Sequence, residues 1–329
     1  MFDQLGRMWA KPEVKAISFA YVTSLFSKVG TLAVQLLALP IIVHSIGTER
    51  FGIVFALASV AVVACIPALS ASSVASQEIS YQLGKSSDNR AEQRFWAFLF
   101  TGMAGATVFM LLGATFAAFF DPTLIFGNQI SPYISEVKLG ILAATAHIFG
   151  YYAFGYMDGI RAAHAENHIS NIVTAIGALA SLIMCFLIYY IDLGSVYTYY
   201  LAVFSLPAFF QILNLVTFIR KRGYKFHTPH LIRNDIFHVG KNIFVNAKMQ
   251  AGYVLHLNLG VLISTRMVGL EAGALHAAVN WLFVLFHSTL VTLANPVTPW
   301  ISRNLSAGNH RKAWLFAIFA TGILLSLSL

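Results

Sequence analysis

A long apolar segment with a lysine near its middle constrains this chain more than any other feature. The segment covers residues 17–46 and reads ISFAYVTSLFSKVGTLAVQLLALPIIVHSI, with Lys28 inside it. About 20 apolar residues are enough for a helix to cross a bilayer, so we predict a transmembrane helix here. A lysine at membrane depth is costly unless it faces water, an opposite charge or protein, which makes Lys28 a functional candidate. The alternative is that its flexible stem carries the charge to the membrane interface.

The same pattern occurs a second time, about 220 residues further along the chain. Residues 239–268 again form an apolar stretch with one internal lysine, Lys248. Each stretch is followed by a short turn in which glycine comes two residues before glutamate, IGTERFG at 46–52 and VGLEAG at 268–273. We interpret this as an internal duplication with both copies in the same direction, as found in transporters whose substrate path lies between two lobes.

The composition excludes an ordinary soluble protein. The chain is 58% hydrophobic and only 10% charged, with a mean hydropathy of +0.72, whereas soluble domains carry about 25% charged residues. The net charge of +8 does not indicate nucleic acid, because the basic residues gather in short connections between apolar stretches. Cys65 and Cys185 lie inside such stretches without metal-ligand spacing, and we predict small buried side chains, no metal site and no cofactor.

Nine apolar segments are long enough, or nearly so, to span a membrane. They cover 17–46, 52–80, 95–120, 135–158, 169–191, 195–218, 239–267, 272–300 and 313–329. Lys and Arg are concentrated before the first segment and after the even-numbered ones, while the remaining connections hold only Arg50, Lys138 and Arg266. Basic residues stay on the cytoplasmic side, so we predict a cytoplasmic N-terminus.

These segments predict an all-α polytopic membrane protein built as a two-lobe helix bundle with a parallel internal repeat. The predicted N-terminal lobe of six helices covers 1–218, a cytoplasmic inter-lobe linker covers 219–238, and the second lobe, with three helices, covers 239–329. The last segment ends within apolar sequence, so we expect the second lobe to be incomplete.

Three stretches resemble one transporter family. They are LPIIVHSIGTERFGIVFAL at 39–57, SASSVASQEISYQLGKSSDNRAEQRFW at 70–96 and YMDGIRAAHAENHISNIVTAIGAL at 156–179. The chain resembles the polysaccharide-transporter branch of the multidrug, oligosaccharidyl-lipid and polysaccharide exporter superfamily, above all its O-antigen flippases. The resemblance implies a flippase of the bacterial inner membrane that moves undecaprenyl-pyrophosphate-linked oligosaccharides by alternating access. It also implies membrane lipids, a polysaccharide polymerase and chain-length components as partners.

The chemistry of such a substrate assigns roles to particular side chains. Lys28 and Lys248 can offset the charge of a pyrophosphate, and Gln35 and Asn258 can hydrogen-bond sugar hydroxyls, although polar links between helices explain these two equally well. Asp158 and Arg161 are a candidate gate pair, with a weak interfacial ion pair as the alternative. The sequence contains no nucleotide-binding, zinc or nucleophile motif, so we do not predict an enzyme.

Two alternatives remain open at this point. The first is a cation-coupled multidrug exporter of the same superfamily, although such a protein normally needs carboxylates within the membrane. The second is a membrane component of a polysaccharide assembly complex that does not itself transport. The sugar, the coupling ion and the oligomeric state do not follow from the sequence.

Overall fold

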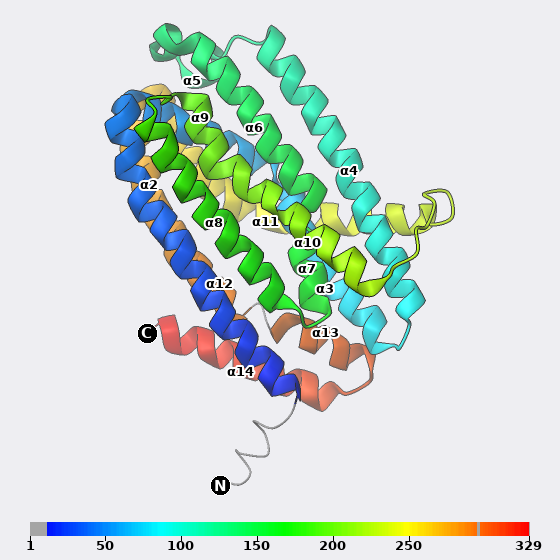
Figure 1. Cartoon of the computed structure of the whole chain (residues 1–329). Coiled ribbons are helices and arrows are strands. Elements are labelled where there is room, and N and C mark those ends of the chain that lie inside the picture. Colours follow the sequence, from blue (N-terminus) through cyan, green and yellow to red (C-terminus); the bar gives the residue numbers. More distant parts are fainter. Residues whose placement is uncertain (1–11, 295–296, 329) are drawn as a thin grey trace.

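The computed structural model describes residues 12–294 and 297–328, and within these ranges the chain forms helices and no strands. Figure 1 shows a tall bundle of long helices with two shorter helices, α13 and α14, at the end where α2 begins. The elements are α2 (Pro12–Ala64), α3 (Ile66–Gly84), α4 (Asp88–Phe119), α5 (Thr123–Phe126), η1 (Asn128–Tyr133), α6 (Ile134–Phe154), α7 (Met157–Ala163), α8 (Asn167–Tyr190), α9 (Val196–Tyr200), the π-helical η2 (Leu201–Ser205), α10 (Leu206–Arg222), α11 (Arg233–Met267), α12 (Leu270–Ala294), α13 (Thr298–Ser306) and α14 (His310–Ser328).

Five helical segments of the described residues are long and apolar enough to cross a membrane. They are Val22–Ala64, Asp88–Phe119, Asn128–Ala163, Asn167–Tyr190 and Val196–Arg222. A shorter apolar helix covers Leu270–Val284. The prediction of an all-α, multi-pass membrane protein is confirmed, and the five segments overlap the six predicted spans from 17 to 218, the second of them only in its first half. The predicted spans at 239–267, 272–300 and 313–329 are not among the five, although the shorter helix covers part of 272–300.

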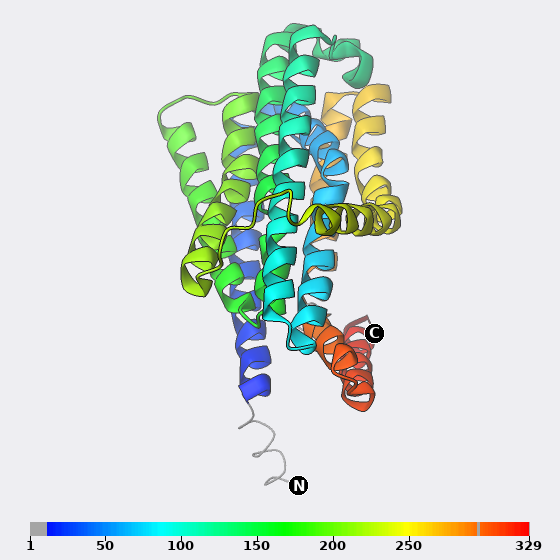
Figure 2. The same cartoon turned by 90° about the vertical axis from the view of Figure 1, so that its right-hand side faces the viewer.

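The first two predicted spans share a helix that reverses direction at a glycine. Gly47 has φ +78° and ψ 167°, which breaks the helical path inside α2. Residues with a side chain rarely adopt this backbone conformation, whereas glycine does so at little cost. The chain rises along the first half of α2 and returns along the second half and α3 (Figure 2). The predicted span at 52–80 is itself interrupted at Cys65, after which α3 begins with Pro67 in its first turn, where proline is well tolerated.

The turn at Gly47 has a counterpart in the second part of the chain. Gly269, between α11 and α12, also has a positive φ, of +143°. Gly47 and Gly269 hold the same place in the two Gly-x-Glu turns, so each turn of the predicted repeat has a glycine with a positive φ. The non-helical connection between α10 and α11 covers residues 223–232 and lies inside the predicted linker.

For the description below, the elements α2–α10, which cover the six predicted spans between 17 and 218, are called the six-helix part. The elements α11–α14 are called the second part. A large apolar core joins α2, α4, α6, α8, α9 and η2 with α11 and α12, and a smaller one joins α3, α4, α7, α10 and the start of α11. Burying these side chains contributes roughly 25 cal/mol per Å² of apolar surface. Both cores include residues from the second part, so the two parts pack directly on each other.

Candidate functional site

At the end of the bundle that carries α5, the two parts are joined by close contacts. A Cβ added at Gly52 would lie 2.3 Å from the carbonyl oxygen of Leu270, so this glycine allows the two repeated turns to meet. The Phe55 ring packs edge-on against Trp281, with ring centroids 4.6 Å apart. Arg266 donates to the carbonyl oxygen of Leu124 at 2.6 Å. These contacts close the α5 end between the parts.

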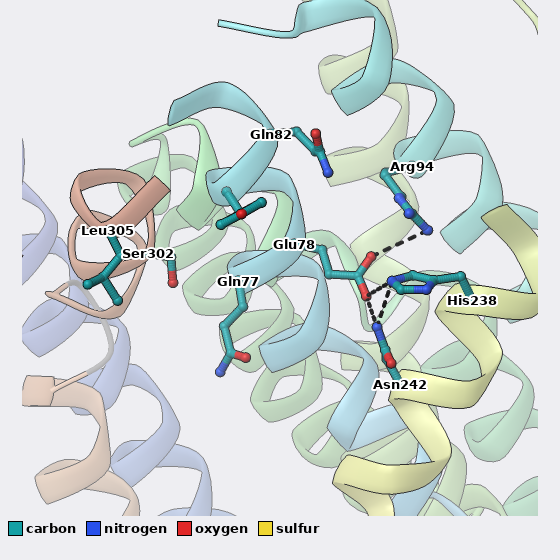
Figure 3. Close-up of a pocket in the computed structure, with 9 residues that line it drawn as sticks. Gln77, Glu78, Gln82, Arg94, His238, Asn242, Ser302 and Leu305 are labelled. Carbon is teal, nitrogen blue, oxygen red and sulfur yellow. Dashed lines mark hydrogen bonds and ion pairs between the residues drawn. The ribbon is translucent and has the colours of Figure 1, made fainter. Parts of the chain in front are cut away.

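Nearer the opposite end, the same two parts border a cavity of about 480 Å³, which we call the inter-part cavity. Figure 3 shows its lining, with α3 in the middle, α13 on one side of it, and α4 and α11 on the other. The lining residues are Gln77, Glu78, Tyr81, Gln82, Arg94, His238, Asn242, Ser302 and Leu305. Four of them lie on the last turns of α3 as two pairs, Gln77 with Tyr81 and Glu78 with Gln82, because residues four apart in a helix lie on the same face.

A group of charged and polar side chains forms one wall of the inter-part cavity. Glu78 accepts a hydrogen bond from Asn242, and the same carboxylate lies 3.5 Å from Nε2 of His238 and 3.7 Å from Nη1 of Arg94. Arg94 also lies 3.5 Å from the Asp235 carboxylate. The wall therefore links the six-helix part to the start of α11 through a carboxylate that three side chains surround (Figure 3).

A second cavity, of about 320 Å³, lies inside the six-helix part between α3, α6, α8 and α10. Its lining is mostly small or apolar, and it includes the carboxylate of Asp158 together with Gln211 and Thr174. Asn214 donates to Asp158 at 3.4 Å and to Ser170 at 2.7 Å. The cavity thus places one acidic group among neutral side chains.

Next to this cavity, Arg161 is completely buried and makes four hydrogen bonds. It donates to Glu166 at 2.5 Å, to the side chain and the backbone carbonyl of Asn214 at 3.0 Å each, and to Thr217 at 2.7 Å. Its guanidinium also lies 5.0 Å from the centre of the Phe218 ring. A buried charge is tolerated when it is paired and its hydrogen bonds are satisfied, so these contacts fasten α7 to α8 and α10.

Glu166 collects three positive charges at the end of the bundle that carries α13. Besides Arg161, it contacts Lys221 at 2.9 Å and Arg222 at 2.8 Å. Burial raises the pKa of this carboxyl, but hydrogen bonds from Lys221 and Arg161 and the charge of Arg222 lower it by more. The net result is a pKa of about 2, below the ordinary value. Nearby, burial and the charge of Arg222 lower the pKa of His164 to about 3. At neutral pH the cluster therefore holds an ionised Glu166 and a neutral His164.

The structure places the predicted gate residues on one short helix without pairing them directly. Asp158 and Arg161 both belong to α7, and their side chains are linked through Asn214, which donates to Asp158 and accepts from Arg161. The ionic partner of Arg161 is Glu166. The gate therefore stays a prediction, now with Asn214 as the intermediate.

The four predicted substrate-binding residues lie on α2 and α11. Lys28 is half-buried, while Lys248 is exposed with its ammonium 4.7 Å from the centre of the Phe244 ring. Asn258 donates to Val254, one turn earlier in its own helix. The side chain of Gln35 lies outside the described residues. Lys28, Lys248 and Asn258 do not line the two cavities above, so their role in binding stays a prediction.

The sequence reasoning did not single out several residues that the fold brings together. Arg94, His238 and Asn242 come from helices far apart in the chain, and only the tertiary packing unites them around Glu78. Glu166 follows Arg161 by five residues, which is not a spacing at which two side chains on one helix meet. The ion pair forms because the chain turns between α7 and α8, and no signal in the sequence marked that turn.

Comparisons with known proteins bear on the fold. No protein-family profile matches the chain, and no curated protein matches it. Among solved structures, the chain is similar to a transporter of the MOP superfamily from Pyrococcus furiosus, which is described as having a binding pocket of reverse polarity. The two are 16% identical with a TM-score of 0.65, and the match covers 96% of this chain and 70% of the transporter.

Two further solved structures have the same fold. An outward-facing multidrug resistance MATE family transporter of the MOP superfamily is 15% identical with a TM-score of 0.67, covering 97% of this chain and 72% of its own. A MATE in complex with Br-NRF is 16% identical with a TM-score of 0.63, and the match covers 97% of this chain and 76% of the MATE chain. The chain therefore has the fold of the transporters of the MOP superfamily.

Proposed function

We propose that the protein is a bacterial inner-membrane flippase that moves an undecaprenyl-pyrophosphate-linked oligosaccharide by alternating access, with its N-terminus in the cytoplasm. The observation that carries this proposal is the inter-part cavity, a space between the two parts near the α13 end. Close contacts join the parts at Gly52 and Leu270 near the α5 end, and at Gly84 and Arg303 beside the cavity. A protein that exposes its substrate to the two sides of the membrane in turn needs a space between its two parts that the substrate head can enter.

The end that holds the cavity agrees with a substrate made in the cytoplasm. The cavity lies beside the connection from α3 to α4, where the basic residues Lys85, Arg90 and Arg94 are found. Basic connections stay on the cytoplasmic side. A lipid-linked sugar could therefore enter here with its head in the cavity and its chain in the surrounding lipid, and would leave after the α5 end opens.

The choice of a lipid-linked oligosaccharide as substrate rests on the three stretches that resemble the flippase branch. Several polar and charged side chains line the inter-part cavity beside its apolar surface, and such side chains can hydrogen-bond a hydrated sugar head. In this proposal Lys28 and Lys248 offset the negative charge of the pyrophosphate. Asp158 and Arg161 form the gate of the substrate path. A polymerase and chain-length components would take up the product on the other side of the membrane.

One observation favours multidrug export as a second candidate. The cavity inside the six-helix part has mainly small and apolar walls and one carboxylate, Asp158, which would suit a lipophilic cation. The solved MATE structures of similar fold include one described as a multidrug resistance transporter. Under this candidate, Asp158 rather than Lys28 would be the principal binding group.

Complementation distinguishes these candidates. The intact chain is expressed in a bacterial strain that lacks its own O-antigen flippase but makes a matching repeat unit, and surface polymer is measured. Restored polymer without increased resistance to ethidium supports the flippase. Increased ethidium efflux without polymer, abolished by Asp158→Asn, supports drug export instead.

A further inference from the structure

The first half of α11, residues 233–249, lies across the bundle rather than along it. Figures 1 and 2 both show the beginning of this helix running at a steep angle to the tall helices. Because those helices cross the membrane, a helix that lies across them runs along the membrane surface. Asp235 contacts Arg94, which follows the start of α4 by six residues, or about 9 Å of helix. The segment 233–249 therefore begins near the end of the bundle, where lipid headgroups surround a membrane protein.

This segment has one buried and one exposed face. Val239, Ile243 and Ala247 are buried, and residues spaced by four lie on the same face of a helix. The opposite face carries large apolar and basic side chains that are exposed. The apolar ones are Phe237, Phe244, Val245 and Met249, and the basic ones are Arg233, Lys241 and Lys248.

The basic side chains of the exposed face are not neutralised by the rest of the protein. Arg233, Lys241 and Lys248 make no ion pair with any other residue of the ranges 12–294 and 297–328. Residues 233–249 contain one acidic residue, Asp235, and its carboxylate is turned to Arg94. The exposed face therefore combines unneutralised positive charge with apolar surface.

A helix face of this kind has the chemistry of a surface that binds anionic lipid. Phenylalanine rings enter the boundary between headgroups and acyl chains, while flexible basic side chains reach the phosphates. Each basic residue near an anionic membrane surface strengthens binding about fivefold. A second copy of the protein is a poorer occupant, because two such faces would bring the same positive charges together.

From these observations we propose that the exposed face of residues 233–249 binds anionic phospholipids of the adjacent leaflet. Arg233 and Lys241 contact the phosphates, and the rings of Phe237 and Phe244 lie among the first carbons of the acyl chains. Lys248 is not needed for this site, since the proposed function assigns it to the pyrophosphate. The inference goes beyond that function, because these phospholipids are not the transported substrate. They hold the beginning of the second part at the membrane surface.

Lipid binding to the purified full-length protein tests the charge of this face. Native mass spectrometry in detergent measures the Kd of the first bound lipid for phosphatidylglycerol, which is anionic, and for phosphatidylcholine, which is zwitterionic. We expect phosphatidylglycerol to bind at least tenfold more tightly. Arg233→Gln with Lys241→Gln should reduce this preference at least tenfold. The matched control is Arg311→Gln with Lys312→Gln, which removes the same charge from exposed positions of α14 and should keep the preference.

A fluorescent label tests the depth of the segment in the membrane. Phe244→Cys is labelled with a nitrobenzoxadiazole group in vesicles of phosphatidylglycerol, where both native cysteines are buried. A lipid spin label near the headgroup should quench this fluorophore more than a spin label near the end of the acyl chain. The control is Asn309→Cys, at an exposed position between α13 and α14, which both spin labels should quench less.

Four results would overturn the proposal. The first is equal affinity of the wild-type protein for the two lipids, and the second is an equal loss of preference in the α14 control. The third is stronger quenching of the Phe244→Cys label by the spin label at the chain end. The fourth is displacement of phosphatidylglycerol by an excess of inorganic pyrophosphate, which would show a site for phosphate without a lipid chain.

The unfolding temperature in phosphatidylcholine shows whether each variant is folded. The substituted basic side chains are exposed, so we expect the wild-type value for both double variants. If the Arg233 and Lys241 variant does not fold, the labelled Phe244→Cys protein decides the outcome, because it keeps both basic residues.

Discussion

Gly52 and the carbonyl oxygen of Leu270 face each other so closely that a Cβ on Gly52 would lie 2.3 Å from that oxygen. Both belong to the repeated turns that join the two parts of the protein. The obstacle is backbone rather than a movable side chain, so a methyl group here must push α2 and α12 apart.

We therefore expect Gly52→Ala to destabilise the protein by about 1–3 kcal/mol, the usual cost of overpacking. Thermal unfolding in detergent would measure this as a lower unfolding temperature. The control is Gly240→Ala, because Gly240 lies in α11 with open space around its Cβ position and alanine favours a helix by about 1 kcal/mol. Equal unfolding temperatures for the two variants would contradict the close contact.

Glu166→Gln should be among the most destabilising single changes that preserve size. It leaves Arg161, which is fully buried, without its ionic partner, and breaking a buried pair costs about 3–5 kcal/mol. Denaturant unfolding followed by tryptophan fluorescence would measure the loss.

The comparison variant for Glu166 is Glu136→Gln. Its partner Arg50 has 40% of its side chain exposed, and exposed pairs contribute about 0–1 kcal/mol. If both variants lost the same free energy of unfolding, the stability of the Arg161 cluster would not depend on the negative charge of Glu166.

The stability of the protein should fall as the solution becomes acidic, in two stages. The pKa of His164 is about 3 in the folded protein against an ordinary 6.5, so protonation favours the unfolded chain, and stability declines as the pH drops from about 6.5 toward 3. The pKa of Glu166 is about 2 against an ordinary 4.5. Its contribution is complete above pH 4.5 and is lost as the pH falls through about 2.

Unfolding temperatures between pH 7 and pH 4 would test the first stage. His164→Gln should flatten the decline between pH 6.5 and 4.5, whereas His310→Gln, at an exposed position, should leave the curve as it is. An unchanged slope in the His164 variant would assign the acid sensitivity to other groups.

Lys28 provides a test of the charge that the flippase proposal places on α2. Lys28→Ala should reduce surface polymer in the complementation assay about tenfold or more, since one lost charge contact is worth 1.4 kcal/mol or more. Lys28→Arg should retain most of the activity because it keeps the positive charge. Protein amounts in the membrane need to be matched, and full polymer with Lys28→Ala would remove this lysine from the mechanism.

The sequence predicted the helical membrane fold because apolar length is a local property. The segments around 95–120 and 169–191 needed no tertiary information, and the glycine turns at Gly47 and Gly269 followed from a repeated motif. The break at Cys65 was missed, since the apolar stretch at 52–80 continues through it. The polar character of α11 explains why the predicted span at 239–267 is not among the membrane-length helices.

The candidate sites were harder to predict for a physical reason. Lys28 and Lys248 were noticed because a charge is conspicuous in apolar sequence, yet neither lines the two cavities described here. Glu78, Arg94 and His238 lie near helix ends, where charged residues are common and usually solvated. Only the packing of α3, α4 and α11 makes these residues neighbours, and no spacing in the chain reports that proximity.

The meeting of the two repeated turns limits how the protein can move. Gly47 and Gly269 each reverse the chain, and the segments that follow them touch at Gly52 and Leu270. Any motion that opens the α5 end must either pull this junction apart or rotate about it. In the second case, a small rotation about the two glycine turns would produce a large displacement at the end of the bundle that carries α13.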